Sequence, residues 1–505
     1  MELQHCDMAQ SGGHRNQHGG LPIKLGPCSN GEFVAPPASG IVSETIRRTN
    51  LAAEQHASWL GISRRSFLAS ACGSALTLLT LAACSKESNN AQGGSEPGGT
   101  FLLPSSSTTE PEVANSVLAS DGQFVMDVQG HLLEYATTPD EPWDGSPFTG
   151  QAFPQANCGE KDPRICFGID SFLDLFFLQS DTSMVVLSAV PIFGTPNPLS
   201  PEVMAKTRAI ARALCEHDRI LTQGMATPNI GDPEIALAAM AALREDFDIA
   251  AWKMYPHIPS TSAFRLDDAD PSLPQVGRHF LDQVRRVGPP IVCVHKGFSS
   301  VGGGYPADPV DIGPAATENP DIDFVVYHSG YEANVTEGPF DAERPNAGID
   351  RLISSVREAE LGPGSNVHAE LGSTWRSVMS APDQAAHVLG KLLVTFGSDN
   401  VVWGSDSIWY GSPQDQIQAF RAFEITEEFQ ERFGYPALTA EVKNKILGIN
   451  AARLYGIEPE HVECEFSGAE LREMRERYPI EPVSFGPANA AELNANLSVL
   501  SPMGT

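Results

Sequence analysis

Several hallmarks of common protein classes are missing from this sequence of 505 residues. Its nine cysteines form no C-x-x-C pair, so the sequence does not indicate a zinc ribbon or a thioredoxin-type redox site. Basic residues are scarce, with 33 Lys and Arg against 63 Asp and Glu, and the formal net charge of −30 opposes binding to nucleic-acid phosphates or anionic lipid headgroups. The apolar fraction of 41% is enough to bury a large core, which indicates an acidic globular protein.

The segment 63–84 has the features of an export signal rather than of a fold element. It reads SRRSFLASACGSALTLLTLAAC, in which twin arginines precede an apolar run of about 17 residues, short for a membrane span. The run ends in Leu-Ala-Ala-Cys, which is similar to a bacterial lipobox. We therefore expect twin-arginine export and a periplasmic or cell-surface lipoprotein, tethered to a membrane only through a lipid on Cys84. A buried hydrophobic helix of the mature protein is the alternative.

The sequence on either side of this signal has few core-forming patterns. Residues 85–120 begin with SKESNNAQGGSEPGGT, a polar, Gly- and Ser-rich stretch typical of a flexible linker. The 62 residues before Ser63 are rich in Gly and His without periodicity, although a twin-arginine signal normally lies near the start of a chain. We expect residues 1–62 to be disordered or to reflect a wrongly assigned start, and residues 461–505 to be a C-terminal extension.

Between residues 121 and 460, short β-branched runs alternate with amphipathic segments that suit crossover helices, such as EVMAKTRAIARALCEHD and DQAAHVLGKLLVTFG. Eight such units predict an α/β fold of the closed (β/α)8 TIM-barrel type. A doubly wound open sheet shares the alternation, but no Gly-rich dinucleotide motif follows any run. The eight runs are FVMDV from Phe124, MVVLSAV from Met184, ILTQGMA from Ile220, IAAWKMY from Ile249, PIVCVH from Pro290, IDFVVYH from Ile322, NVHAEL from Asn366 and NVVWGSD from Asn400.

Ligand-type and titratable side chains gather where these strands end. In a closed barrel the chemistry collects at the C-terminal ends of the strands. Alternation along the first strand points Asp127, Gln129 and His131 to one side. One such histidine is more often structural, but imidazoles and carboxylates at several strand ends suit zinc, iron or manganese. The other strand-end residues are Lys253, His295, His328, Glu370 and Asp406.

Five sequence blocks between Phe124 and Ile457 resemble the amidohydrolase-related proteins, which include metal-dependent hydrolases and decarboxylases of the aminocarboxymuconate-semialdehyde type. The blocks are VCVHKG, FVVYHSGYE, SNVHAELGSTW, NVVWGSDSIWYGSP and VKNKILGINAARLYGI. The third and fourth of these blocks, SNVHAELGSTW and NVVWGSDSIWYGSP, look particularly like a subgroup of exported amidohydrolases. The resemblance implies a metal-dependent hydrolase barrel with His131, His295 and Asp406 as metal ligands and with His328 in the strand-6 histidine role, as a ligand or beside the metal.

The first strand departs from the family pattern D-x-H-x-H, because Gln129 stands at the position of the first histidine. The amide oxygen of Gln129 can ligate a metal, but more weakly than imidazole ligates a transition metal. Three roles are open for Lys253. It could be carboxylated and bridge two metal ions, pair with Glu370, or contact a carboxylate of the substrate. Glu370 is a catalytic candidate that can equally be structural. The reduced motif favours one divalent ion, with zinc expected ahead of manganese or iron.

With one ion in place, the constellation predicts a hydrolase that attacks a C–O or C–N bond of a small organic substrate with metal-activated water. Asp406 would accept the proton of that water, and His328 would stabilise the oxyanion or shuttle a proton. The same residues suit decarboxylation of an unsaturated or aromatic acid, and a catalytically inactive, surface-tethered binding protein is a third reading. We expect the protein to bind a small-molecule substrate and not nucleic acid. The oligomeric state is open, and a homodimer is one option. Cys158 and Cys166 either pair in a disulfide or stay free thiols.

Overall fold

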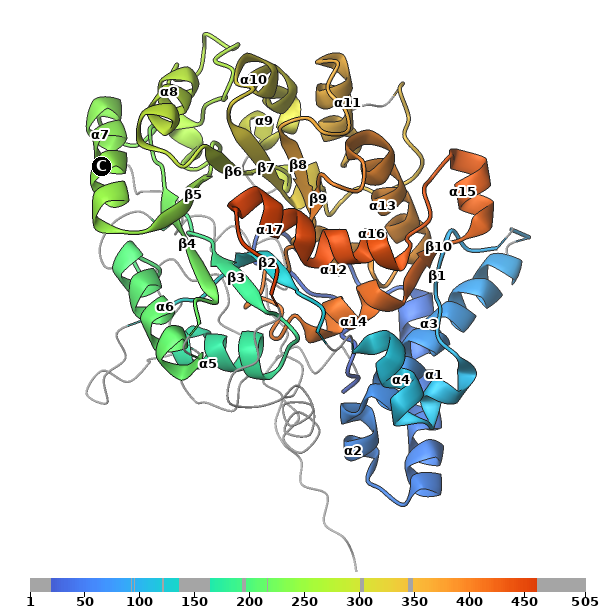
Figure 1. Cartoon of the computed structure of the whole chain (residues 1–505). Helices are drawn as coiled ribbons and strands as arrows, with labels where there is room; N and C mark the ends of the chain where they lie inside the picture. The colour runs from blue at the N-terminus through green and yellow to red at the C-terminus, as the bar shows by residue number, and fades with distance from the viewer. Residues whose placement is uncertain are drawn as a thin grey trace, which may run out of the picture.

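The computed structural model describes residues 20–135 and 164–460, apart from 92, 95, 120–121, 193–196, 216, 300–303 and 344–347. Its centre is a sheet of eight parallel strands that follow one another in chain order (Figure 1). These strands are β2 Met126–Gly130, β3 Met184–Leu187, β4 Ile220–Met225, β5 Ile249–Met254, β6 Ile291–His295, β7 Asp323–Tyr327, β8 Val367–Glu370 and β9 Val401–Val402.

The sheet closes on itself between β2 and the chain that follows β9. Val128 N donates to Trp403 O at 3.0 Å, and Asp406 N donates to Gln129 O at 3.0 Å. Gly130 forms a parallel bridge with Ser407. The predicted (β/α)8 barrel is therefore confirmed, and the open-sheet alternative is wrong, because the first strand bonds to the segment after the last.

Helices cover the outside of the barrel, and most lie where the amphipathic segments predict them. In α8, Phe280, Leu281 and Val284 are buried against the sheet layer, while the basic pair Arg285 and Arg286 ends the helix. The helices between β3 and the end of the barrel are α6 Pro201–Cys215, α7 Pro233–Asp246, α8 Gly277–Val287, α9 Gly304–Ala307, α10 Ile312–Glu318, α11 Asp350–Glu358, α12 Thr374–Val378, α13 Pro382–Phe396, α14 Gln414–Ala422, α15 Glu427–Phe433, α16 Ala440–Asn444 and α17 Asn450–Tyr455. The short α5 Ile169–Leu173 continues into a π-helical turn, η3 Asp174–Leu178.

Strand alternation divides the apolar residues between the barrel interior and the helix layer. On β7, Val325 and Tyr327 belong to the interior cluster, whereas Phe324 and Val326 pack in the outer core with the helices. Ala451 and Ala452 of α17 join the interior cluster, so this helix packs against one end of the barrel (Figure 1). The polar strand ends gather at the C-terminal end of the strands.

An N-terminal layer packs beside the barrel. It contains α1 Gly40–Leu60, α2 Arg64–Ala69, α3 Ala71–Ala91, β1 Gly99–Phe101, η1 Ser105–Thr108 and α4 Pro111–Leu118. β1 pairs antiparallel with β10 Phe423–Ile425. Residues 1–62 were expected to be disordered or to reflect a wrongly assigned start, and 85–120 to be a flexible linker. In the described parts of 20–62 and 85–119 the chain instead forms the elements named above, and in the second stretch Phe101 contacts Phe423.

Cys84 lies buried in α3, and no helix in the described ranges is long and apolar enough to span a membrane. The structure of the whole chain does not show whether the chain is cut before Cys84, so the export signal stays a prediction. The expected C-terminal extension, 461–505, falls outside the described residues.

Replacing Gly404 by alanine should destabilise the barrel at its seam. The added Cβ would lie 1.7 Å from Oε1 of the buried Glu370 and 3.2 Å from Cβ of Gln129. We expect the free energy of unfolding to fall by about 1–3 kcal/mol, the usual cost of overpacking a core. Gly362→Ala is the matched control, since nothing lies within 4 Å of its added Cβ. Urea unfolding measures both variants, and equal midpoints would show that the seam tolerates a methyl group.

Candidate active site

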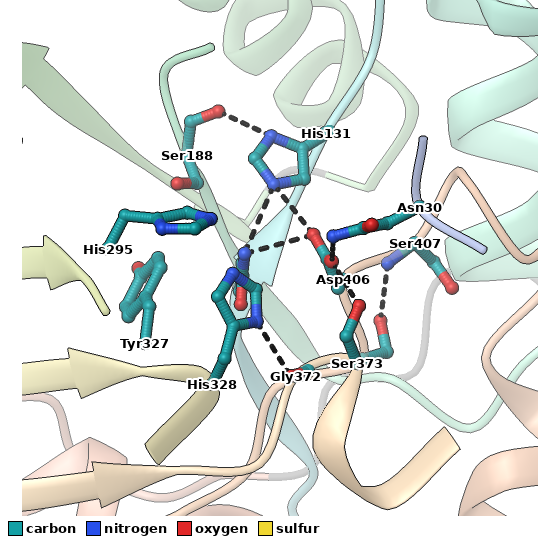
Figure 2. A network of polar contacts seen from close by, with 12 residues as sticks. Asn30, His131, Ser188, His295, Tyr327, His328, Gly372, Ser373, Asp406 and Ser407 are labelled. Atoms are coloured by element: carbon teal, nitrogen blue, oxygen red, sulfur yellow. Dashed lines mark hydrogen bonds and ion pairs between the residues drawn. The ribbon is translucent and has the colours of Figure 1, made fainter. Parts of the chain in front are cut away.

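Gln129, His131 and Asp406 meet where the barrel closes. Nε2 of His131 lies 3.0 Å from Oδ1 of Asp406 (Figure 2), and Nε2 of Gln129 donates to the same oxygen at 2.9 Å. Nδ1 of His131 lies 2.8 Å from the carbonyl oxygen of Ser188. A carbonyl oxygen only accepts, so Nδ1 carries a proton and Nε2 is the atom that His131 presents to the site.

Asp406 is a buried carboxylate surrounded by donors. Its second oxygen, Oδ2, accepts from the hydroxyl of Ser373 and from Nδ2 of Asn30, the latter at 3.0 Å (Figure 2). Burial alone would raise the pKa of Asp406, but the hydrogen bond from His131 and the nearby His328 lower that pKa to about 2. The carboxylate is therefore ionised at neutral pH.

His295 and His328 form the other half of the site, with Glu32 between them and solvent. Nε2 of His295 lies 2.7 Å from Oε1 of Glu32, although the contact lacks hydrogen-bond geometry. Nδ1 of His328 donates to the carbonyl oxygen of Gly372 at 2.8 Å, which leaves its buried Nε2 without a hydrogen-bond partner. The rings of His295 and His328 lie 4.6 Å apart, edge to face.

These residues fit a divalent metal ion. One ligand atom each from Glu32, His295 and His328 lies within 4.8 Å of the others, a wider spacing than the roughly 3.3 Å between nitrogen or oxygen ligands of one tetrahedral zinc ion. Buried imidazole nitrogens without partners, such as Nε2 of His328, are costly unless something binds them. Metal-binding histidines typically donate their second N–H to a carbonyl oxygen, as His131 and His328 do here.

Backbone strain marks two of the predicted residues. His328 and Asp406 have φ values of +65° and +57°, and Ser329, next to His328, has +50°. Non-glycine residues rarely adopt this left-handed conformation, and those that do cluster at functional sites. The strain lies at the ends of β7 and β9, where the two side chains turn toward the cavity.

Lys253 is buried and does not line the cavity. Its Nζ has no hydrogen-bond partner and lies 3.6 Å from the ring centroid of Tyr327. Burial lowers the pKa of Lys253 to about 8, although the negative charges of nearby groups such as Asp406 and Glu370 act to raise it. Among the described residues no ion pair includes Lys253, so the structure does not show the expected pair with Glu370.

Glu370 supports the site from below. Its two oxygens accept the backbone N–H groups of His328, at 2.9 Å, and Gly372, at 2.5 Å. Burial raises its pKa to about 8 despite these hydrogen bonds. The carboxyl group thus holds the two chain segments that position His328. This is a structural role, one of the two roles that the sequence left open for Glu370.

Four polar side chains around the site were not anticipated from the sequence. Ser373 lies three residues beyond the end of β8, and His257 lies three residues beyond the end of β5, with its ring 4.7 Å from that of His295. The strand-end rule that selected the other histidines could have found His257. Asn30 and Glu32 come from a segment far away in sequence, and no local pattern signals their position.

All five predicted metal-binding residues, together with Asn30 and Glu32, line one cavity of about 60 Å³. Tyr255 and Trp409 add aromatic walls, and the ring of Trp409 stacks on His131 with 5.2 Å between centroids. Cys158 lies outside the described residues, whereas Cys166 is disulfide-bonded, so their pairing stays a prediction.

Comparison with solved structures finds weak likenesses among barrel enzymes. A 2,6-dihydroxybenzoate decarboxylase from Rhizobium is 14% identical, with a TM-score of 0.37 over 67% of this chain and 99% of that chain. A candidate 2-pyrone-4,6-dicarboxylic acid hydrolase from Pseudomonas putida is 16% identical, with a TM-score of 0.39 and coverages of 67% and 99%. A 5-carboxyvanillate decarboxylase from Sphingomonas paucimobilis is 13% identical, with a TM-score of 0.39 and coverages of 66% and 100%. Likeness at this level supports no inference about activity.

Comparison with curated proteins finds no match. The family model described as amidohydrolase matches residues 182–457, which begin just before β3 and end after α17. The matched range is more than half of the 505 residues and contains His295, His328 and Asp406. It confirms the resemblance inferred from the strand-end motifs, and the chain therefore belongs to the amidohydrolase family.

Proposed function

We propose that this chain is a hydrolase that uses one divalent metal ion to cleave a C–O or C–N bond of a small organic substrate. Zinc is the ion that we expect first. The observation that carries the proposal is the convergence of three imidazoles and one ionised carboxylate on a single cavity. Two of the imidazoles, His131 and His328, have Nδ1 tied to a carbonyl oxygen, so that Nε2 is left for the site.

From the resemblance we expect His131, His295 and Asp406 to hold the ion, with His328 as a further ligand or a neighbour. Among the described residues, the ligand atoms that lie within 4.8 Å of one another belong instead to Glu32, His295 and His328, and those of His131 and Asp406 lie outside this group. Gln129 adds an amide whose Oε1 is buried without a hydrogen-bond partner. A bound divalent ion supplies Lewis acidity, which lowers the pKa of a water molecule and polarises a substrate oxygen. Manganese and iron are alternative ions, since they also accept imidazole and carboxylate ligands.

Proton transfer is better suited to His328 than to Asp406. The low pKa of Asp406 favours a carboxylate that stays charged, which suits a ligand more than a strong base. His328 donates through Nδ1 to the Gly372 carbonyl, so that its lone pair lies on Nε2, and burial lowers its pKa, which keeps the ring neutral before it accepts a proton. That nitrogen could then return the proton to a leaving group.

Decarboxylation of an unsaturated or aromatic acid is the second candidate. The observation that favours it is the carboxylate of Glu32, which already lies against His295 in the cavity. A substrate carboxylate could take the place of the Glu32 carboxylate beside His295 when Glu32 leaves the cavity. Product analysis on unsaturated acids, compared with esters, lactones and amides, distinguishes the two reactions.

Loss of a predicted ligand should empty the site. We expect His295→Ala and Asp406→Ala each to lose most of the bound metal and at least about 10²-fold in activity, because an open site of three or four ligands cannot spare one. Elemental analysis gives the metal content, and a panel of small esters gives the activity. His368→Ala is the matched control, because His368 contacts Asp323 at the start of strands β8 and β7, away from the strand ends where the cavity lies, and does not line the cavity. Full metal content in both site variants would place the ion elsewhere, and an empty wild-type protein would favour a binding protein without catalysis.

Replacing Gln129 by histidine should raise zinc affinity. The side chains of Gln129 and His131 face each other across 3.4 Å between their Nε2 atoms, so an imidazole at position 129 would add a second nitrogen ligand from β2. We expect at least about tenfold tighter zinc binding in competition with a chelator. Activity need not rise, because a more fully ligated ion can lose its open position. Unchanged affinity in a folded variant would show that position 129 does not reach the ion.

We also propose that the chain is exported and that its mature form begins at a lipid-modified Cys84, supported by the order of the twin arginines, the apolar run and Leu-Ala-Ala-Cys. In the full chain Cys84 is buried in α3, so this helix would have to leave its neighbours before modification. Mass spectrometry of the membrane fraction of expressing cells should find a lipid on an N-terminal Cys84. An unmodified Cys84 inside a longer chain in the membrane-free fraction would contradict the proposal.

A further inference from the structure

A segment without helix or strand, Leu21–Phe33, lies across the mouth of the barrel. Four of its apolar side chains are buried in the main core, with exposed fractions of 0% to 4%, and they are Leu21, Ile23, Leu25 and Phe33. Phe33 stacks on Phe298, which follows β6, with ring centroids 5.0 Å apart and planes 6° from parallel. Burial of this extent shows that the segment is seated on the barrel in the full chain.

Lys24 anchors the segment to the chain after β9. Its backbone N–H donates to Oδ2 of Asp415 at 3.1 Å, and its ammonium lies 3.3 Å from Oδ1 of the same residue. The ammonium also donates to the carbonyl oxygens of Tyr410 and Ser412. All four contacts are buried or partly buried, so they hold the segment more firmly than exposed ion pairs would.

The tip of the segment is a turn that points two side chains into the site. Gly31 has φ of +96°, a conformation that favours glycine. The hydroxyl of Ser29 accepts from the Gly31 N–H at 3.0 Å and donates to the carbonyl oxygen of Phe33, which closes the turn. Asn30 thereby reaches Oδ2 of Asp406 (Figure 2), and Glu32 reaches Nε2 of His295.

The seated segment leaves little room for a substrate. The cavity that remains between Asn30, Glu32 and the predicted ligands has a volume of about 60 Å³. Pockets for small organic ligands typically measure about 300–1,000 Å³. The remaining space suits an ion and one or two water molecules, whereas an organic substrate would have to displace the segment.

We propose that Leu21–Phe33 is an intramolecular plug of the active site, in which Glu32 acts as a ligand of the metal ion and Lys24 holds the plug in the barrel mouth. The Glu32 part of this inference rests on the proposed metal site, whereas the seating of the segment does not. Because the plug precedes Cys84, cleavage at the expected signal would remove it and open the site.

Cys28 provides a direct measure of plug opening. It is a free, half-buried thiol within the plug, while Cys72, Cys84 and Cys293, the other described cysteines outside disulfides, are buried. The rate of its reaction with a thiol reagent, corrected by a Cys28→Ser variant for other cysteines, reports how often the segment leaves the barrel. We would measure this rate in the full chain with and without manganese, which binds thiols only weakly.

In Lys24→Ala, Cys28 should react at least about tenfold faster than in the wild type, since the variant loses several hydrogen bonds made by a charged group. Lys86→Ala is the matched control, because Lys86 forms an exposed ion pair with Glu96 away from the barrel mouth, and its rate should not change. Manganese should slow the reaction in the wild type but not in Glu32→Gln, which keeps the shape of the side chain and loses its charge. Circular dichroism confirms that each variant is folded.

If Cys28 reacted with the thiol reagent equally fast in the wild type and in Lys24→Ala, the proposal that this segment is a plug would be wrong. A slow wild-type rate that manganese does not change, in protein shown by elemental analysis to contain the ion, would overturn the role of Glu32. Absence of bound manganese and zinc in every variant would instead refute the proposed function, and the comparison of Lys24→Ala with the wild type would still decide whether the segment is a plug.

Discussion

The closure of the barrel between β2 and the chain after β9 is the constraint on which the site depends. The bonds from Asp406 N to Gln129 O and from Val128 N to Trp403 O join segments more than 270 residues apart. They fix the carboxylate of Asp406 beside Gln129 and His131, so that these three predicted metal ligands are assembled by main-chain pairing. An open sheet with the same strands would leave these groups at opposite edges.

The other half of the site depends on buried polar support. Glu370 accepts main-chain N–H groups from His328 and Gly372, and the Gly372 carbonyl in turn accepts from Nδ1 of His328. The strained backbone of His328 is held by these bonds, which aim its Nε2 at the cavity. The absence of a side chain at Gly404 leaves room for the carboxyl group of Glu370. The residue that supports His328 therefore packs directly against the chain segment that closes the barrel.

The N-terminal segment connects the chemistry of the site to the rest of the chain. It places a carboxylate 2.7 Å from Nε2 of His295, donates an amide N–H to Asp406, and fills space that a substrate would need. With the segment seated, the ring nitrogens of His295 and Nε2 of His328 still have no hydrogen-bond partner, which is costly unless an ion binds them. The same segment keeps the barrel mouth closed while it is attached.

The sequence by itself determined the eight βα units, the closed barrel and most of the ligand-type side chains that line the cavity, because strand alternation, helical spacing and strand-end polarity are local patterns. His131, His295, His328 and Asp406 were found in this way, and the structure brings them to one cavity. Tertiary structure alone decided that Glu370 supports the backbone, that Lys253 lies unpaired under aromatic rings, and that β1 pairs with β10. It also decided that Asn30 and Glu32 enter the site, since their positions depend on apolar burial and ion pairing between segments hundreds of residues apart, which no local pattern encodes.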